Sequence, residues 1–273
     1  MLKDITLGQY YQTESEIHRL DPRVKIVATL LFIISLFIAD NFIGYVIAAA
    51  FLGLEIHMSH VPFRFIMRGM KTIVFLLLIT VVFNLFLTPG TPLIHLWKLT
   101  ITYEGLALAS MMAVRLIFLI IGSSVMTLTT TPNHLTDGLE SLMNPMKKIH
   151  VPVHEISMMM SIALRFIPIL LEETDKIMKA QIARGADFES GNMLQRAKAM
   201  IPILVPLFVS AFRHANDLAM AMEARCYHGG EGRTKMKPLR YVSRDRVAYA
   251  IVILYVAAVF VIGRYVPFHI WIF

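Results

Sequence analysis

The sequence predicts an all-α polytopic membrane protein with about five transmembrane helices and a helical cytoplasmic domain inserted before the last span. The first observation is composition: 56% of the 273 residues are hydrophobic and 16% are charged, with a mean hydropathy of +0.63. Soluble globular chains carry about 45–50% apolar and about 25% charged residues. The second observation is that the apolar residues form long runs, and the third is that Lys and Arg gather in particular loops.

Five apolar runs are candidates for spans, since a helix needs about 20 apolar residues to cross the hydrocarbon core. They are Val24–Ala39, Phe42–Ile56, Thr72–Leu87, Gly105–Leu128 and Val247–Ile262. Each must be helical in lipid, because an open strand would leave backbone groups unpaired. Several are short, so their ends rely on aromatic and basic side chains at the interface. Asp21 and Pro22 are typical of an N-cap and a first helical residue, which predicts that the first run is a retained span.

The distribution of positive charge predicts the orientation. If alternate loops are cytoplasmic, 23 of the 26 Lys and Arg residues lie on that side, and 16 of them lie between Thr131 and Arg246. Cytoplasmic loops of membrane proteins carry such an excess. We therefore expect a cytoplasmic N-terminus and an external C-terminus. The net charge of +7 then reflects topology and attraction to the membrane surface, and no motif indicates binding of nucleic acid.

Two further apolar runs lie within the basic region. Ile156–Leu171 contains Arg165 and Pro168, and Met200–Phe212 contains two prolines. If both runs crossed the membrane, five Lys and Arg residues between them would lie outside, against the charge rule. We interpret them as cytoplasm-side helices that bury one face against the membrane domain or a partner. An alternative, in which they dip partly into the bilayer, stays open.

The chain therefore divides into three predicted regions. Residues 1–130 form an N-terminal membrane domain with four spans. Residues 131–246 form the cytoplasmic helical domain, and residues 247–273 form the last span and an external C-terminus. Arg115 lies near the middle of the fourth span, where an uncompensated charge is expensive. It has to face either a pore or, as the preferred interpretation, an internal structural partner.

Two predicted helices of the cytoplasmic domain end alike, about 41 residues apart. Both carry the pattern Ala-x-x-Ala-Arg-small in the last turn, and the three final residues are Ala183, Arg184 and Gly185 in one and Ala224, Arg225 and Cys226 in the other. A Gly just past a helix end permits a left-handed cap, and the helix dipole favours a cation there. A guanidinium on a rigid tip suits a bidentate grip on carboxylates or carbonyls. An Arg in a last helical turn is also common without any function.

Several chemistries lack a pattern in the sequence. A lone Cys226 allows no internal disulfide, and the ten His residues show no metal-ligand spacing. Gly229–Thr234 does not have the spacing of a phosphate-binding loop and follows a helix rather than a strand. We therefore expect neither a catalytic site nor a cofactor or metal bound by this chain.

The order of short motifs carries a family resemblance. It covers His18–Lys25, Leu128–Pro132, Ala163–Pro168, Ala180–Gly185, Pro206 and Ala221–Arg225. With these motifs the chain resembles, over nearly its full length, the T component of energy-coupling factor transporters, the CbiQ-like transmembrane coupling subunits. The family pattern has Gly where Cys226 stands, and Cys is the poorer residue in a left-handed conformation.

The resemblance implies partners and a mechanism. In the family, two Arg-containing motifs end coupling helices that dock into grooves on two cytoplasmic ABC ATPases, and Arg184 and Arg225 would take these roles. ATP and Mg would bind to those ATPases, and a small membrane S component would capture a vitamin or a metal ion. The protein would then reside in the cell membrane of a prokaryote and would have no catalytic activity of its own. The sequence does not determine which substrate is transported or whether S components are shared.

Methionines concentrate in the predicted coupling domain, with 11 of the 18 between Thr131 and Arg246. Flexible, polarisable Met suits a surface that accepts several partners, although it also fills irregular helix contacts. The candidates for contact with the S component are Met158, Met159, Met160, Pro168 and Met220. Two other functions stay open, a self-sufficient secondary transporter and a membrane-embedded enzyme; the first predicts internal repeats with polar breaks in the spans.

Overall fold

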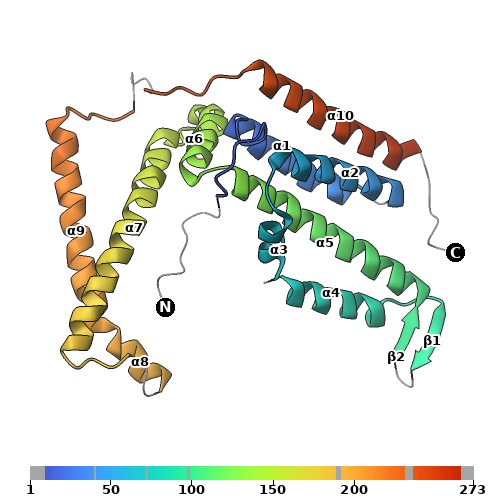
Figure 1. The fold of residues 1–273 in the computed structure, drawn as a ribbon, viewed down its shortest axis with the longest axis horizontal. Helices are drawn as coiled ribbons and strands as arrows, with labels where there is room; N and C mark the ends of the chain where they lie inside the picture. Colours follow the sequence, from blue (N-terminus) through green and yellow to red (C-terminus); the bar gives the residue numbers. More distant parts are fainter. Residues whose placement is uncertain are drawn as a thin grey trace. The chain divides into compact units, whose positions relative to one another are not determined.

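The computed structural model describes residues 10–265, except 40, 72, 97–98, 189–191 and 231–235 (Figure 1). The chain forms two compact units. We call Gly8–Leu139 together with Leu239–Phe273 the core unit, and Glu140–Pro238 the inserted unit. Each unit is described by itself. The three regions predicted from the sequence stay a prediction, because compactness does not show on which side of a bilayer a segment lies.

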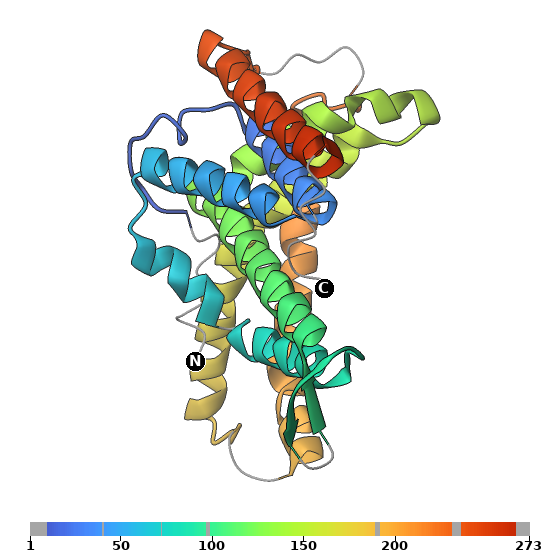
Figure 2. The same ribbon diagram turned by 90° about the vertical axis from the view of Figure 1, so that its right-hand side faces the viewer.

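The core unit is a helical assembly with one small sheet. Its helices are α1 (Pro22–Ile38), α2 (Phe42–Ser59), α3 (Phe63–Lys71), α4 (Val74–Leu87), α5 (Tyr103–Thr129), the first part of α6 (Pro132–Met143) and α10 (Ser243–Tyr265). The long helix α5 contacts α1, α2, α3 and α4, and α10 contacts α1 and α2. Figure 2 shows α5 extending from the hairpin at its N-terminus to the end of the unit where α1 begins.

The buried core lies where these helices meet. Phe32 and Leu36 of α1, Val125 of α5 and Val259 of α10 belong to one cluster and are almost fully buried. Gly122 permits the close approach of α5 to α1, because a Cβ there would lie 2.7 Å from the Phe32 ring. The first helix begins as predicted, with Pro22 in its first turn and the Asp21 side chain accepting the Arg23 N–H at 2.9 Å.

Two elements were not predicted. Between α4 and α5 the chain forms an antiparallel hairpin of β1 (Pro92–Leu96) and β2 (Leu99–Thr102), in which Ile94 pairs with Ile101. The charged loop after α2 contains the short helix α3, whose Ile66 is fully buried. Both segments are too short for a clear periodic pattern, so packing decides their structure.

Five helical stretches in the described residues are long and apolar enough to cross a membrane: α2, α5, α7, Met193–Ala224 and α10. Three of them coincide with predicted spans. The predicted runs Val24–Ala39 and Thr72–Leu87 correspond to helices of 17 and 14 residues, α1 and α4. The other two stretches contain the predicted cytoplasm-side runs, which continue into longer helices through Pro168 and Pro206. Length and composition do not place them, so both interpretations of these runs stay open.

The inserted unit consists of the end of α6, the 3-10 helix Asn144–Ile149, α7 (Val153–Ala183), α8 (Met193–Ala199) and α9 (Ile201–Ala224). The helices α7 and α9 pack as an antiparallel pair (Figure 1). At one end the Gln181 side chain donates to the Pro202 carbonyl at 3.4 Å, and further along the Phe166 ring lies 5.8 Å from the His214 ring. Most side chains of this pair are exposed or half-buried.

Candidate functional site: two arginine-capped helix ends

Helix α7 ends in a complete Schellman motif. The Gly185 N–H donates to the Ile182 carbonyl at 2.9 Å, and the Ala186 N–H donates to the Gln181 carbonyl at 3.0 Å. Gly185 has a φ of +86°, in the left-handed region that Gly adopts without strain. Arg184 is the C-cap residue and is exposed. The cap predicted from the sequence is thus present.

Helix α9 ends in the same way although Cys replaces Gly. The Cys226 N–H donates to the Glu223 carbonyl at 2.9 Å, and the Tyr227 N–H donates to the Met222 carbonyl at 3.0 Å. Cys226 has a φ of +56°, so it takes the left-handed conformation for which it is the poorer residue. A side chain in this region costs about 1 kcal/mol. Arg225 is the exposed C-cap residue, matching Arg184.

The two tips lie at opposite ends of the helix pair. Because α7 and α9 are antiparallel, Arg184 lies near the start of α9, and Arg225 lies near the start of α7. The 24 residues of α9 span about 36 Å at the helical rise, which sets the scale of their separation. Among the residues that the structure describes, neither guanidinium has an ion-pair partner. Each tip can therefore take its own partner.

The segment that follows the Arg225 tip lies against the start of α7. Gly230 lies on the His154 ring, since a Cβ at Gly230 would come within 2.4 Å of that ring. The same ring lies 3.1 Å from a carboxylate oxygen of Glu140 through Nδ1, and Ser157 donates to the other oxygen of Glu140 at 3.0 Å. This contact set was not predicted, because nothing in the sequence pairs residues 140, 154 and 230. It fixes the segment that follows the Arg225 tip.

A second polar contact set lies between α7 and α9. The Ser210 hydroxyl donates to Glu173, and His214 Nε2 lies 3.5 Å from the other oxygen of that carboxylate. Sequence reasoning missed it, since only the antiparallel register brings α7 and α9 residues together. The hydroxyl is bonded to the carboxylate rather than to the imidazole, so the arrangement does not activate a serine nucleophile.

The candidate residues for contact with the S component lie on the exposed sides of α7 and α9. Met159 and Met220 are 58% and 61% exposed, Met160 and Pro168 are also exposed, and Met158 is half-buried. Next to these residues, α7 and α9 line a groove of about 260 Å³. Its lining includes Ile162, Phe166, Leu170, Ala215, Leu218 and Met222. The surface is therefore apolar and contains flexible side chains.

Arg115 has internal partners, in agreement with the preferred interpretation. Its Nε donates to the Tyr45 hydroxyl at 3.0 Å, and an Nη donates to the Ala39 carbonyl at 3.3 Å. The guanidinium also lies 5.5 Å from the Phe37 ring. In the described part of the chain no group of three His, Cys, Asp or Glu side chains could hold a metal ion.

Comparison with known proteins agrees with the resemblance. The family model CbiQ, cobalt transport protein, matches residues 13–236. A relative from Clostridium kluyveri, named energy-coupling factor transporter transmembrane protein EcfT, is 58% identical over 250 residues, covering 91% of this chain and 93% of the relative. Proteins of the same name from Ruminiclostridium cellulolyticum and Bacillus subtilis are 49% and 45% identical, covering 98% and 95% of this chain and 100% and 98% of the relatives. The chain belongs to the CbiQ family, and its close relatives are named as transmembrane proteins of energy-coupling factor transporters.

Proposed function

We propose that this chain is the coupling subunit of an ATP-driven importer, in which Arg184 and Arg225 each grip one of two cytoplasmic ABC ATPases. The observation that carries the proposal is the pair of matching helix ends: both close in a Schellman motif, and both present an exposed arginine as the C-cap residue. A rigid tip holds the guanidinium at a defined angle, so little conformational entropy is lost on docking.

The separation of the tips supports two contacts rather than one. Because the two tips lie at opposite ends of a helix about 36 Å long, the arginines are too far apart for one pocket, whereas two ATPase subunits would offer two equivalent grooves. Each arginine stands at a helix C-terminus, where the negative end of the dipole favours a cation. Its guanidinium is the positive charge that carboxylates of a partner would bind. Hydrolysis of ATP, with its Mg²⁺, would take place on the ATPases.

The apolar side of α7 and α9 is the proposed contact surface for the membrane S component. Met158, Met159, Met160 and Met220 lie toward the same end of the helix pair, with Pro168 further along α7. Movement of the tips would pass along these helices to the S component, which would release a vitamin or a metal ion inside the cell. The charge distribution supports a cytoplasmic N-terminus and an external C-terminus.

Charge reversal at the tips tests the proposal. The tagged chain is extracted from native membranes in mild detergent, and its copurifying proteins are identified. We expect two ATPases and one or more small hydrophobic proteins with the wild-type chain. Arg184→Glu and Arg225→Glu should each reduce ATPase recovery at least ten-fold, since truncation or reversal of a buried charge partner costs several kcal/mol.

The matched controls lie on the same two helices. Arg165 of α7 and Arg213 of α9 are exposed arginines away from the tips, and their reversal to Glu should leave ATPase recovery unchanged. Equal losses for tip and control variants would indicate a general charge effect and contradict the proposal. Normal recovery and normal ATP-driven uptake in the Arg184→Glu, Arg225→Glu double variant would also contradict it.

A further inference from the structure

Lys25 is buried at the point where α5 ends. Its side chain belongs to α1, is 7% exposed, and donates from Nζ to the Thr129 carbonyl at 2.8 Å and to the His18 carbonyl at 3.2 Å. The neighbouring Leu128 carbonyl accepts the Tyr11 N–H at 2.9 Å. The last carbonyls of a helix lack intrahelical partners and carry the negative end of its dipole, so a buried ammonium stabilises them. The C-terminus of α5 is thus fastened to α1 and the segment before it.

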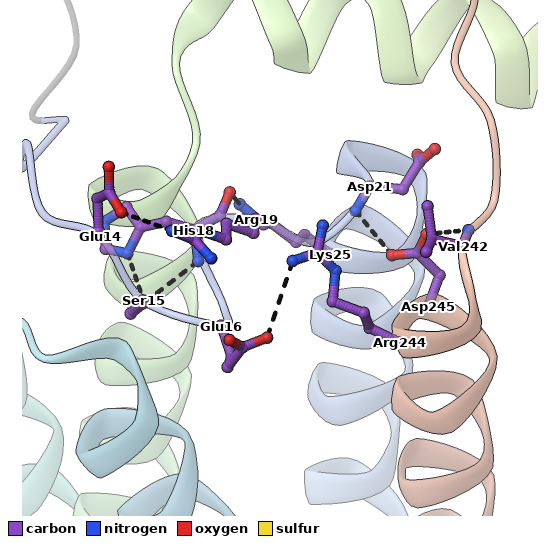
Figure 3. A network of polar contacts seen from close by, with 10 residues as sticks. All are labelled: Glu14, Ser15, Glu16, His18, Arg19, Asp21, Lys25, Val242, Arg244 and Asp245. Carbon is purple, nitrogen blue, oxygen red and sulfur yellow. Dashed lines mark hydrogen bonds and ion pairs between the residues drawn. The ribbon is translucent and has the colours of Figure 1, made fainter.

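Asp245 is buried where α10 begins and caps two helices with one carboxylate. It is 2% exposed and accepts the Asp21 N–H at 3.0 Å and the Val242 N–H at 2.7 Å (Figure 3). Asp21 is the N-cap residue of α1, and Val242 directly precedes α10. A carboxylate at a helix N-terminus satisfies orphan N–H groups and favours the positive end of the dipole. The N-terminus of α10 is thus fastened to the N-terminus of α1.

Further contacts tie the same segments together. Arg23 donates from Nε and Nη to the two Asp21 oxygens at 3.0 and 2.8 Å, and its guanidinium lies 3.8 Å above the Tyr241 ring. Burial alone would raise the pKa of Asp21, but the hydrogen bonds from Arg23 outweigh it and lower that pKa, so the carboxylate stays charged at neutral pH. At the rim, Arg244 lies 3.8 Å from Glu16 (Figure 3).

The network lies at the two connections of the inserted unit. The chain leaves the core unit soon after α5 ends at Thr129 and returns to it just before α10 begins at Ser243. The segment 241–245 follows closely after the inserted unit, and residues 128–130 are joined to it through the part of α6 that belongs to the core unit. We call residues 128–130 and 241–245 the two connections. A displacement of the inserted unit acts on the core unit through them.

We propose that Lys25 and Asp245 are positioning residues that fasten both connections to α1, so that movement of the inserted unit reaches the spans of the core unit. This inference rests on the proposed function, because it requires that ATPases move the inserted unit. Each residue bonds backbone groups at a helix end. These bonds fix both the orientation of the connection and its distance from α1. Without Lys25 and Asp245, the two connections unfold locally when the inserted unit moves, and the movement does not reach the core unit.

The test follows hydrogen exchange in the complex of the full chain with its copurified ATPases, before and after addition of ATP and vanadate. In the wild type, we expect an ATP-dependent change in exchange in α7 and α9 and also in α2 and α5. In Lys25→Met and Asp245→Asn, the change in α7 and α9 should persist, whereas the change in α2 and α5 should fall about ten-fold. A loss of this size is typical for removing a hydrogen bond to a charged group.

Two variants separate positioning from simple destabilisation. Arg19→Met removes a cation of the same region that bonds only the exposed Glu14, and it should transmit the change like the wild type. Lys25→Arg keeps a cation at the α5 carbonyls and should restore most of the transmission. If Lys25 only stabilised the fold, Lys25→Met would alter exchange in both units alike, and Lys25→Arg would not restore the change in α2 and α5 selectively. If Asp245→Asn does not fold, the two Lys25 variants decide the question.

The outcomes are distinguishable. Full transmission to α2 and α5 in both Lys25→Met and Asp245→Asn would overturn this inference while leaving the proposed function intact. Absence of any ATP-dependent change in α7 and α9 of the wild-type complex would contradict the proposed function, and the positioning role would fall with it.

Discussion

The core unit and the inserted unit use their apolar residues in opposite ways. Among the described residues, eighteen of the twenty buried hydrophobic side chains belong to the core unit, and only Val153 and Ile203 belong to the inserted unit. The core unit buries one side of its helices, as with Leu36 and Val259, and leaves others such as Phe75 and Leu254 exposed. In α9, the stripe Ile201, Leu204, Val205, Phe208 and Phe212 is exposed throughout.

This contrast in burial indicates different roles for the two units. A chain with a shared core keeps its shape by itself, whereas a helix pair with few buried side chains relies on other molecules to cover its apolar surface. Polar contacts of Lys25 and Asp245 join helices of the core unit, whereas Arg184 and Arg225 of the inserted unit are exposed at helix tips. The inserted unit is therefore suited to contact, and the core unit to holding position.

We expect the largest effect in an experiment that asks whether the exposed surface of the inserted unit faces the cytoplasm. Cys226 is the only cysteine of the chain, and it is exposed. In intact cells that express the chain without ATPases, a membrane-impermeant maleimide should leave Cys226 unlabelled, and permeabilisation should raise labelling at least ten-fold. The positive-inside distribution gives the physical reason.

Two variants control this experiment. Cys226→Ser should abolish labelling, and Cys226→Ser combined with Pro89→Cys, at an exposed residue after α4, should be labelled in intact cells. Equal labelling of Cys226 before and after permeabilisation would reverse the proposed orientation.

A matched pair of leucine truncations measures the difference in packing energy between the two units. Leu36→Ala in the buried core should lower the free energy of unfolding by about 3 kcal/mol, because the cavity left behind does not collapse completely. Leu204→Ala on α9, where the side chain is 53% exposed, should change it by less than about 0.5 kcal/mol. Thermal unfolding of the purified chain without partners measures both. Similar losses would show that Leu204 is buried by a contact within the chain.

The smallest expected effect concerns the two helix ends. Cys226→Gly should stabilise the chain by about 1 kcal/mol, since Gly takes the left-handed conformation without a Cβ clash, and Gly185→Ala should destabilise it by a similar amount. The same unfolding measurement with the wild type as reference checks the opposite signs. Two shifts of equal sign would mean that the two caps differ in conformation in solution.

Local chemistry made part of the fold and of the site predictable. Asp21 and Pro22 mark the start of α1 because a short polar side chain and a fixed φ suit a helix N-terminus. The repeated Ala-Arg ending predicted where α7 and α9 stop, because the left-handed cap depends on one or two adjacent residues. Cys226 takes the left-handed conformation although a Cβ disfavours it, so its cap did not follow from residue type alone.

Contacts between distant residues could not be predicted. Lys25 bonds residue 129, Asp245 bonds residue 21, and Glu173 meets Ser210, and no local pattern records these pairings. The hairpin β1–β2 and the helix α3 are too short for their periodicity to identify them. The two apolar runs with Pro168 and Pro206 were predicted to be helices, but their continuation into α7 and α9 of 31 and 24 residues was not.

Hydropathy and capping depend on residues close together in the chain, so they were enough to predict the class of protein, the positions of most apolar helices and the two arginine-capped ends. The tertiary structure alone decided that α7 and α9 run antiparallel with Arg184 and Arg225 at opposite ends, and that Lys25 and Asp245 fasten both connections of the inserted unit to α1. These arrangements depend on which buried surfaces and helix termini meet, and that choice is made only when the whole chain packs.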